Sequence, residues 1–287
     1  MTYSAGGIWY SNDGKNWTNC SKEPVTDIAY NGVLYIITYN GVDTWVVGSH
    51  WRTGNNLAYS NDGKNWTAVT NIFVDGLVNS IVYNGVDTWV AIGTEIAYSN
   101  DGKIWTSVIK NSYFFGNALV YDGDKWVALG ENGYQSTDRK IWTEVKIDAI
   151  VIDVAYNGVD TLVAVRWSNQ NTSSISYSKD GVTWKNGTNI FPTSIGFSVA
   201  YNGIDTWVAV GGGLGTSEPT ICYSNDSVTW KNGTDIFSGG TGISVSYTWV
   251  AIGYAVDLDV KYTFTAAYSK DGINWTIGSC IIDSHLD

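Results

Sequence analysis

The strongest constraint on the fold is a short phrase, S-x-D-G-x-x-W, which recurs seven times along the chain. Its aspartates are separated by 49, 39, 37, 42, 46 and 45 residues, and they stand at Asp13, Asp62, Asp101, Asp138, Asp180, Asp226 and Asp271. Self-similarity at a spacing of about 43 residues is typical of repeat architectures. The 287 residues are therefore predicted to form a single domain, residues 1–287, built from similar units.

Each unit contains four strand-length segments, which are seen in full in residues 198–237. The first ends in Tyr-Asn-Gly, the second reads Thr-Trp-Val-Ala-Val, the third reads Ile-x-Tyr-Ser, and the fourth begins at the Trp of the phrase. Asn-Gly and Asp-Gly pairs favour tight hairpin turns, so each unit is predicted to be an antiparallel sheet. Fifteen Trp and 19 Tyr against three Pro agree with an all-β class. Four antiparallel strands per unit are the signature of a β-propeller blade.

The number of blades depends on how the two ends of the chain are used. Second segments of the Trp-Val-Ala or Leu-Val-Ala kind occur six times, so the first copy of the phrase lacks the leading half of its unit. Near the C-terminus, Cys280-Ile281-Ile282 could supply the innermost strand of the blade begun by residues 1–18. Because such closure would remove the open edge of the array, we predict seven blades closed by strands from both termini. Six blades with a capping hairpin are the alternative.

Charge and composition disfavour several classes of partner. The chain has a net charge of −11 and no evident basic surface, which disfavours binding to nucleic acid or to anionic lipid. The three cysteines, Cys20, Cys222 and Cys280, occupy unrelated positions in the repeat, so neither a disulfide framework nor a metal site is predicted, and no cofactor is expected. The N-terminus has no basic n-region and no long apolar run follows, so we expect neither a signal peptide nor a membrane-inserted segment. The compartment stays open.

The repeated phrase resembles the Asp-box, or BNR, repeat of sialidase-like β-propellers, and the resemblance covers essentially the whole chain. The common motif is one residue longer, S-x-D-x-G-x-T-W, and two copies here depart further, with Arg139 and Ser227 in the Gly position. The resemblance implies repeats near 11–17, 60–66, 99–105, 136–142, 178–184, 224–230 and 269–275. It also implies that each phrase is structural and lies in the turn between the third and fourth strands, away from the functional face.

Elementary turn chemistry agrees with a structural role for the Ser, Asp and Trp of each copy. An Asp in a tight turn can accept backbone N–H groups, Gly relieves the strain of a positive φ, and Trp pins the hairpin to the blade. These residues are Ser11, Asp13, Trp17, Ser60, Asp62, Trp66, Ser99, Asp101, Trp105, Ser136, Asp138, Trp142, Ser178, Asp180, Trp184, Ser224, Asp226, Trp230, Ser269, Asp271 and Trp275.

Candidate binding residues emerge once the structural tryptophans are set aside. Seven Trp belong to the phrase and five to second strands, which leaves Trp9, Trp51 and Trp167. The last two lie in variable loops at the opposite end of the blades from the phrase, where function is expected. Because Trp beside Arg is the composition of an interaction hot spot, the predicted ligand-binding residues are His50, Trp51, Arg52, Arg166 and Trp167. The alternative is that each Trp folds onto its own blade.

Enzymatic activity finds less support in the sequence. The resemblance suggests sialidase activity, which needs three Arg around one carboxylate, but Arg139 lies in a repeated turn at the opposite end from Arg52 and Arg166. Another glycoside hydrolase needs two carboxylates about 5–10 Å apart. Loop candidates for such a pair are Glu95, Glu131, Glu218, Asp257 and Asp259.

The sequence therefore favours a non-enzymatic β-propeller that binds a glycan or a protein partner through its variable loops. Two alternatives stay open: a glycoside hydrolase that is not a true sialidase, and a structural component of a larger particle or surface assembly. The ligand and the oligomeric state are not predicted.

Overall fold

The computed structural model describes residues 9–10, 18–19, 34–49, 55–70, 72–73, 76–110, 115–167, 173–212, 218–246, 250–256 and 262–277. These residues form strands and turns, and they include no helix long and apolar enough to span a membrane. The chain groups into two compact units, residues 1–144 and 145–287. The single-domain organisation stays a prediction.

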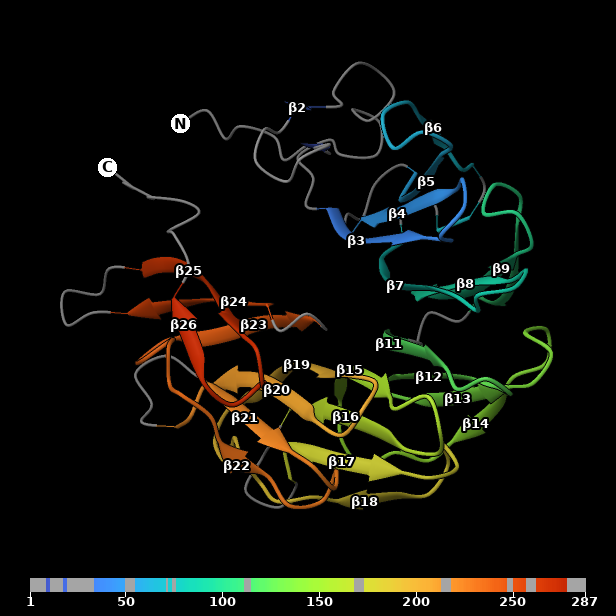
Figure 1. The fold of residues 1–287 in the computed structure, drawn as a ribbon. Coiled ribbons are helices and arrows are strands. Elements are labelled where there is room, and N and C mark those ends of the chain that lie inside the picture. Colours follow the sequence, from blue (N-terminus) through green and yellow to red (C-terminus); the bar gives the residue numbers. More distant parts are fainter. Residues whose placement is uncertain are drawn as a thin grey trace. The chain divides into compact units, whose positions relative to one another are not determined.

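Six four-stranded antiparallel sheets make up most of the described chain, and in each sheet consecutive strands pair as a meander (Figure 1). We call them blades 1 to 6 in chain order. Blade 1 contains β3 (Leu34–Tyr39), β4 (Trp45–Ser49), β5 (Leu57–Ser60) and β6 (Trp66–Ala68); blade 2 contains β7 (Val78–Tyr83), β8 (Trp89–Gly93), β9 (Glu95–Ser99) and β10 (Trp105–Lys110); blade 3 contains β11 (Gly116–Tyr121), β12 (Trp126–Gly130), β13 (Gly133–Ser136) and β14 (Thr143–Val145).

The second unit holds the other three blades. Blade 4 contains β15 (Val151–Tyr156), β16 (Leu162–Arg166), β17 (Ile175–Ser178) and β18 (Trp184–Asn186); blade 5 contains β19 (Ile195–Tyr201), β20 (Trp207–Gly212), β21 (Ile221–Ser224) and β22 (Lys231–Asn232); blade 6 contains β23 (Thr241–Ser246), β24 (Val250–Val256), β25 (Tyr262–Ser269) and β26 (Trp275–Ile277). The all-β class and the four-stranded unit predicted from the repeat are confirmed.

The prediction of seven complete blades is wrong for the described residues, which hold six four-stranded sheets. The first copy of the phrase is flanked instead by a two-stranded sheet of β1 (Trp9–Tyr10) and β2 (Thr18–Asn19). Each copy of the phrase marks one hairpin turn, whereas a blade also needs two leading strands, and among the described residues none precedes β1. Counting phrases therefore overestimates the number of blades. The predicted closing strand, Cys280-Ile281-Ile282, lies outside the described residues.

The second strand is the buried centre of blades 1 to 5, whereas Val250 and Ile252 of β24 in blade 6 are exposed. β8, β12 and β16 are buried along their whole length, as expected for a strand covered on both faces. The paired first strand carries a register shift near its start in all six blades. Such β-bulges add twist to a strand, so the same local bend recurs where each blade begins.

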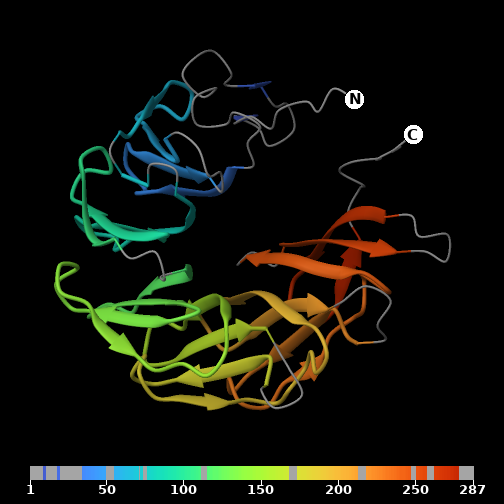
Figure 2. The same ribbon diagram turned by 180° about the vertical axis from the view of Figure 1, so that it is seen from behind.

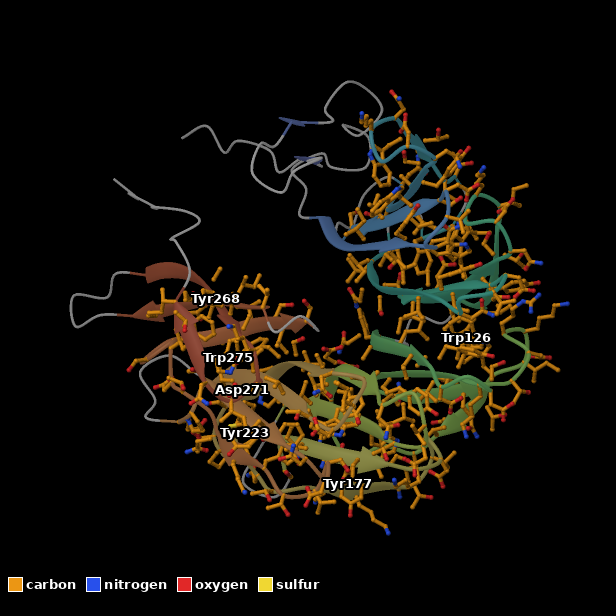
Figure 3. All side chains as sticks on the ribbon, in the orientation of Figure 1. Trp126, Tyr177, Tyr223, Tyr268, Asp271 and Trp275 are labelled. Atoms are coloured by element: carbon orange, nitrogen blue, oxygen red, sulfur yellow. The ribbon has the colours of Figure 1, made fainter. Side chains whose placement is uncertain are left out.

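The core lies between successive blades as well as within them. In the second unit, Val163 and Val165 of blade 4 form one buried cluster with Trp207 and Ala209 of blade 5. Tyr177, Tyr223 and Tyr268 stand at the same place in the third strands of blades 4, 5 and 6 (Figure 3). Tyr177 and Tyr223 pack against the buried clusters shared with the next blade, whereas Tyr268 in blade 6 is exposed. The repeated apolar sequence therefore builds a repeated interface, which is what a blade needs to bury its faces.

First strands of consecutive blades lie side by side within each unit: β7 lies next to β3 and β11, and β19 lies next to β15 and β23 (Figure 2). Polar side chains link them. Asp153 of β15 accepts hydrogen bonds from Ser198 Oγ (2.9 Å) and from the backbone N of Val199 (3.0 Å) on β19. In the first unit, Thr38 Oγ1 of β3 donates to the carbonyl oxygen of Ile81 on β7 (2.8 Å).

A second link, the outer clasp, joins the far edges of blades 4, 5 and 6. It is made by the Thr of an Asn-Gly-Thr sequence that follows the fourth strand. Thr188 N donates to the carbonyl oxygen of Val228 in the next blade's phrase (2.9 Å), and Thr188 Oγ1 accepts from Trp230 N (3.4 Å). Thr234 repeats the contact one blade later, with its N donating to the carbonyl oxygen of Ile273 (3.2 Å). Both edges of these blades are thus tied to their neighbours.

Candidate binding site

Antiparallel strand order places the connections of each blade at two ends. The turns from the first to the second strand and from the third to the fourth strand lie at one end, which we call the turn end. The connections from the second to the third strand and from blade to blade lie at the other, the loop end. The two ends differ in how their polar side chains are used.

At the turn end, the repeated phrase forms a self-contained turn. In blade 1, Asp62 Oδ1 accepts the N–H groups of Asn65 (2.7 Å) and Lys64 (2.8 Å), and Ser60 Oγ donates to the same oxygen (3.0 Å). Gly63 has a φ of 69°. The N–H groups of Asn65 and Lys64 hold the pKa of Asp62 well below its usual range. The same bonds recur at Asp101, Asp138, Asp180, Asp226 and Asp271.

The turn between the first and second strands is equally uniform. Asn40 Oδ1 accepts the N–H groups of Val42, Asp43 and Thr44, each at 3.0 Å. Asn84, Asn157 and Asn202 repeat this arrangement. In both kinds of turn the Asp or Asn side chain accepts hydrogen bonds from the backbone of the same turn. The turn end is therefore a set of near-identical turns rather than one specialised site.

Two copies of the phrase place an ordinary side chain where glycine is preferred. Arg139 has a φ of 61° and Ser227 a φ of 65°, a conformation that costs an L-residue about 1–2 kcal/mol. Arg139 Nη2 donates to Asn100 Oδ1 (3.3 Å), and its guanidinium lies over the ring of Tyr98, 5.5 Å from the centroid. Arg139 is thus engaged at the turn end, between blades 2 and 3.

The loop end varies from blade to blade around a shared anchor. The second and third strands are joined by Thr94 alone in blade 2, but by residues 167–174 in blade 4. The anchor is an Ile-Phe pair in the blade-to-blade loops that follow blades 1, 4 and 5. The buried pairs are Ile72 with Phe73, Ile190 with Phe191, and Ile236 with Phe237. The sequence signal for this anchor is the repeated Ile-Phe dipeptide, which lies inside otherwise variable loops.

Blade 4 departs from the repeat at Arg166, the last residue of its second strand. The equivalent residue is glycine in blades 2, 3, 5 and 6, as the pairing with the first strand shows: Gly93, Gly130, Gly211 and Gly253. A Cβ at Gly93 would overlap the carbonyl oxygen of Leu77 in the same blade. Blade 4 therefore carries the largest change that this position shows among the described blades.

The Arg166 side chain is turned into its own blade and is only 2% exposed. Its Nε donates to the carbonyl oxygen of Ser173 (2.7 Å), its Nη1 to Asp148 Oδ1 (2.6 Å), and its Nη2 to Asn186 Oδ1. A buried guanidinium is stabilised when several acceptors share it. Arg166 therefore ties together three separate segments: the loop before β15, the loop after β16, and the end of β18.

Trp167 follows Arg166 and is 55% exposed. Its backbone is fixed on both sides, because its N donates to the carbonyl oxygen of Ile150 (3.0 Å) and it forms an isolated antiparallel bridge with Ile195. Together with Asp148, Ala149 and Ile150, Trp167 lines a depression of about 390 Å³. A fixed backbone below an exposed ring gives a platform whose position is set before any ligand arrives.

The chemistry of the depression is an aromatic face beside a carboxylate. The Asp148 side chain is 65% exposed although Arg166 holds one of its oxygens. An exposed indole can stack on flat or aliphatic groups and can attract a cation to its face. The volume falls within the range of about 300–1,000 Å³ that is usual for ligand sites.

Of the five predicted ligand-binding residues, two are described. Arg166 and Trp167 are both next to the depression, but only Trp167 is exposed, whereas Arg166 lies behind the surface with its donors occupied. The expectation that Arg166 meets a ligand directly does not fit this burial. His50, Trp51 and Arg52 lie outside the described residues, so their role stays a prediction.

The loop carboxylates proposed for a glycosidase come from separate blades. Glu95 of blade 2 is buried and Ser107 Oγ donates to its Oε2 (2.8 Å). Glu131 of blade 3 is exposed. In blade 5, Glu218 Oε1 accepts from the N (2.8 Å) and Oγ1 (2.7 Å) of Thr193. Asp257 and Asp259 lie outside the described residues.

The part of the chain that the structure describes contains neither a cluster of metal-ligating side chains nor an accessible thiol. There, no group of three or more His, Cys, Asp and Glu side chains is placed to hold a metal ion. Cys222 is buried in β21, and burial, followed by the nearby Asp235, raises the pKa of its thiol. Cys20 and Cys280 lie outside the described residues.

Asp148, Ala149 and Ile150 were missed by sequence reasoning. They lie in a short blade-to-blade loop without a motif, and only the fold brings this loop beside Trp167. The sequence does carry a signal next to Trp167. When the second strands are aligned, Arg166 stands where most blades have glycine.

Comparison with known proteins places the fold. No protein-family model matches the sequence, and no curated protein matches it. Virginiamycin B lyase from Staphylococcus aureus is similar in structure, with a TM-score of 0.66 and 11% identity over 87% of this chain and 85% of that chain.

YCF48 from Cyanidioschyzon merolae has a TM-score of 0.54 with 12% identity, covering 84% of this chain and 82% of that chain. A structure of YCF48 bound to D1 peptide has a TM-score of 0.51 with 13% identity, covering 70% of this chain and 67% of that chain. These neighbours are β-propellers, so the comparison supports a β-propeller fold. At such low identity it carries no statement about activity.

Proposed function

We propose that this chain is an Asp-box β-propeller that acts without catalysis, as a binding module for a protein partner. The observation that carries the proposal is the exposed, backbone-fixed Trp167 at the one described blade where arginine replaces the repeat's glycine. Function on a repeated scaffold is expected where one unit departs from the others, and here the departure supports an exposed aromatic side chain. Trp is also among the residues that most often contribute strongly to binding.

The positions of the charged residues favour binding over sialidase-type hydrolysis. Arg166 gives its donors to three acceptors of its own blade, and Arg139 is engaged at the turn end. Neither guanidinium is offered to a substrate carboxylate at the loop end. Glu95 and Glu218, two candidates for a glycosidase pair, already accept hydrogen bonds from Ser107 and Thr193.

A glycan is the second candidate ligand, because an exposed indole can also stack on the apolar face of a sugar. A third possibility, a structural part of a larger assembly, would use the same surface for a persistent protein contact. The three readings differ in what the isolated protein captures.

The experiment uses the full chain on a glycan array, on a peptide-display library and against a panel of chromogenic glycosides. Kd for the captured ligand is then measured for the wild type, for Trp167→Ala, and for Val159→Ala as a control. Val159 is exposed at the turn end of the same blade. We expect Trp167→Ala to weaken binding about tenfold or more, with a change in stability within about 0.5 kcal/mol.

The proposal fails if both variants bind as well as the wild type, since the ligand would then sit elsewhere. It also fails if the glycosides are turned over and Glu131→Gln or Glu218→Gln abolishes the turnover. Equal losses of binding and stability in Trp167→Ala would make Trp167 a packing residue rather than a contact.

A further inference from the structure

The depression at Trp167 has a polarity that selects among ligands. Its described lining consists of one aromatic ring, two aliphatic side chains and one carboxylate, from Trp167, Ala149, Ile150 and Asp148. The aliphatic part is open to solvent, since Ile150 is 37% exposed. A ligand that fits must therefore be apolar along its length and carry one hydrogen-bond donor or positive charge that can pair with the carboxylate.

The carboxylate is fixed in place rather than free to swing. Arg166 Nη1 donates to Asp148 Oδ1 (2.6 Å), and the arginine side chain is 3% exposed while that of Asp148 is 65% exposed. The pair thus points its positive group into the blade and its negative group outward. Among the described residues no donor reaches Asp148 Oδ2, which leaves this oxygen for a ligand.

The charge of the whole chain favours a cation at such a position. A net charge of −11 attracts basic partners and repels acidic ones. An indole face attracts a cation, and a lysine or arginine side chain has a hydrocarbon stem that lies on apolar surface while its charged end stays at the rim. A sugar instead presents several hydroxyl groups, for which the described lining offers a single charged acceptor.

We infer that the depression receives the side chain of a lysine or arginine from the protein partner, with the stem on Trp167 and Ile150 and the charged end at Asp148. This inference rests on the proposed binding function and names the chemistry of its ligand. Arg166 is a positioning residue here: it holds Asp148 but does not touch the ligand.

The test uses 19F NMR of the full chain labelled with 5-fluorotryptophan, which reports on the ring of Trp167 directly. The Trp167 line is assigned as the line missing from Trp167→Phe. The probes are Nα-acetyl-lysine amide, the uncharged Nα-acetyl-norleucine amide, and N-acetylglucosamine. We expect the lysine probe to shift the Trp167 line saturably, with a Kd about tenfold lower than that of the norleucine probe, since cation–π attraction and the ion pair add.

The matched variants are Asp148→Asn and Asp160→Asn. Both remove an exposed carboxylate of blade 4 that pairs with a cation, but Asp160 lies at the turn end, paired with Lys179 (2.9 Å). Asp148→Asn is expected to raise the Kd of the lysine probe about threefold, and Asp160→Asn to leave it unchanged. A circular dichroism melt of Asp148→Asn checks that the loss of its pair with Arg166 has not unfolded the blade, and the salt dependence of wild-type binding gives a second readout that needs no variant.

Three results would overturn the inference: equal affinity for the lysine and norleucine probes, a Trp167 shift with N-acetylglucosamine alone, or no Trp167 shift with any probe. The proposed function fails separately. A partner whose binding is lost in Trp167→Ala, but without a response to the lysine probe, would keep the binding function and refute the basic side chain.

Discussion

Asp153 gives the sharpest test of the forces between blades. Burial between β15 and β19 raises the pKa of its carboxyl from 3.8 to about 6, against the hydrogen bonds from Val199, Ser198 and Val154 that oppose the shift. The folded state therefore favours the protonated form. Each pKa unit is worth about 1.4 kcal/mol, so ionised Asp153 makes the fold less stable by about 3 kcal/mol than the protonated form does.

The sign of the pH dependence follows from linkage. Between pH 4 and pH 6 the folded protein binds this proton and the unfolded chain does not, so the contribution of Asp153 to stability falls as pH rises. Asp153→Asn removes the titration while keeping an acceptor oxygen for Ser198 and Val199. Loss of the bond from Val154 N adds a cost of about 1 kcal/mol at every pH, which cancels when two pH values are compared.

The assay is urea unfolding of the wild type and of Asp153→Asn at steps from pH 4 to pH 8, followed by tryptophan fluorescence. Relative to the wild type, the variant should gain about 2.4 kcal/mol of unfolding free energy between pH 4 and pH 7.5, because at pH 4 the unfolded chain also binds part of this proton. Asp205→Asn is the control, because side-chain hydrogen bonds from Asn202 and Thr206 lower the pKa of Asp205 and place its titration below this range. A difference between wild type and Asp153→Asn that stays constant with pH would refute the reasoning.

Two further predictions concern backbone conformation in the turns. Gly102→Ala should lose about 1–3 kcal/mol more stability than Gly85→Ala, because both have a positive φ but only Gly102 would press a Cβ within 3.0 Å of the preceding blade; equal urea midpoints would contradict this. Ser227→Gly should stabilise the protein by about 1 kcal/mol by relieving a φ of 65°, and the reverse change at the equivalent glycine, Gly181→Ser, should destabilise it by a similar amount in the same assay. A melting temperature that does not rise for Ser227→Gly would count against strain at that turn.

Local signals were enough to predict the blades. The Trp of the second strand, the Asn-Gly turn and the Ser-x-Asp phrase each act over a few residues, and β4, β8, β12 and β20 begin at the expected Trp. The number of blades was harder, because a phrase reports one turn and not the strands before it. Closure by strands from both termini, which stays a prediction, would pair segments far apart in the sequence, and no short pattern records such pairing.

The site was harder to predict because two neighbouring residues of similar surface character have different environments. Removing the structural tryptophans left Trp167, which the structure places in an exposed position. Arg166 looked like a surface arginine, but its guanidinium is buried by acceptors that are 7, 18 and 20 residues away in the chain. Asp148 is one of these acceptors, and no motif in its own loop predicts its contact with Arg166.

The outer clasp bears on how such a chain can change in length. Thr188 and Thr234 each bind the following blade, so both clasps join unlike surfaces: the segment after the fourth strand of one repeat and the turn between the third and fourth strands of the next. Contacts of this head-to-tail kind can link different numbers of repeats, in a closed ring or in an open array. Suppose that one whole repeat, ending just after such a threonine, is removed or added. Every remaining clasp then still has its threonine and the turn to which this threonine binds. A deletion that ends within a repeat leaves a threonine or a turn without its hydrogen-bond partner. Deletions should therefore be tolerated in steps of a full blade and in no smaller step.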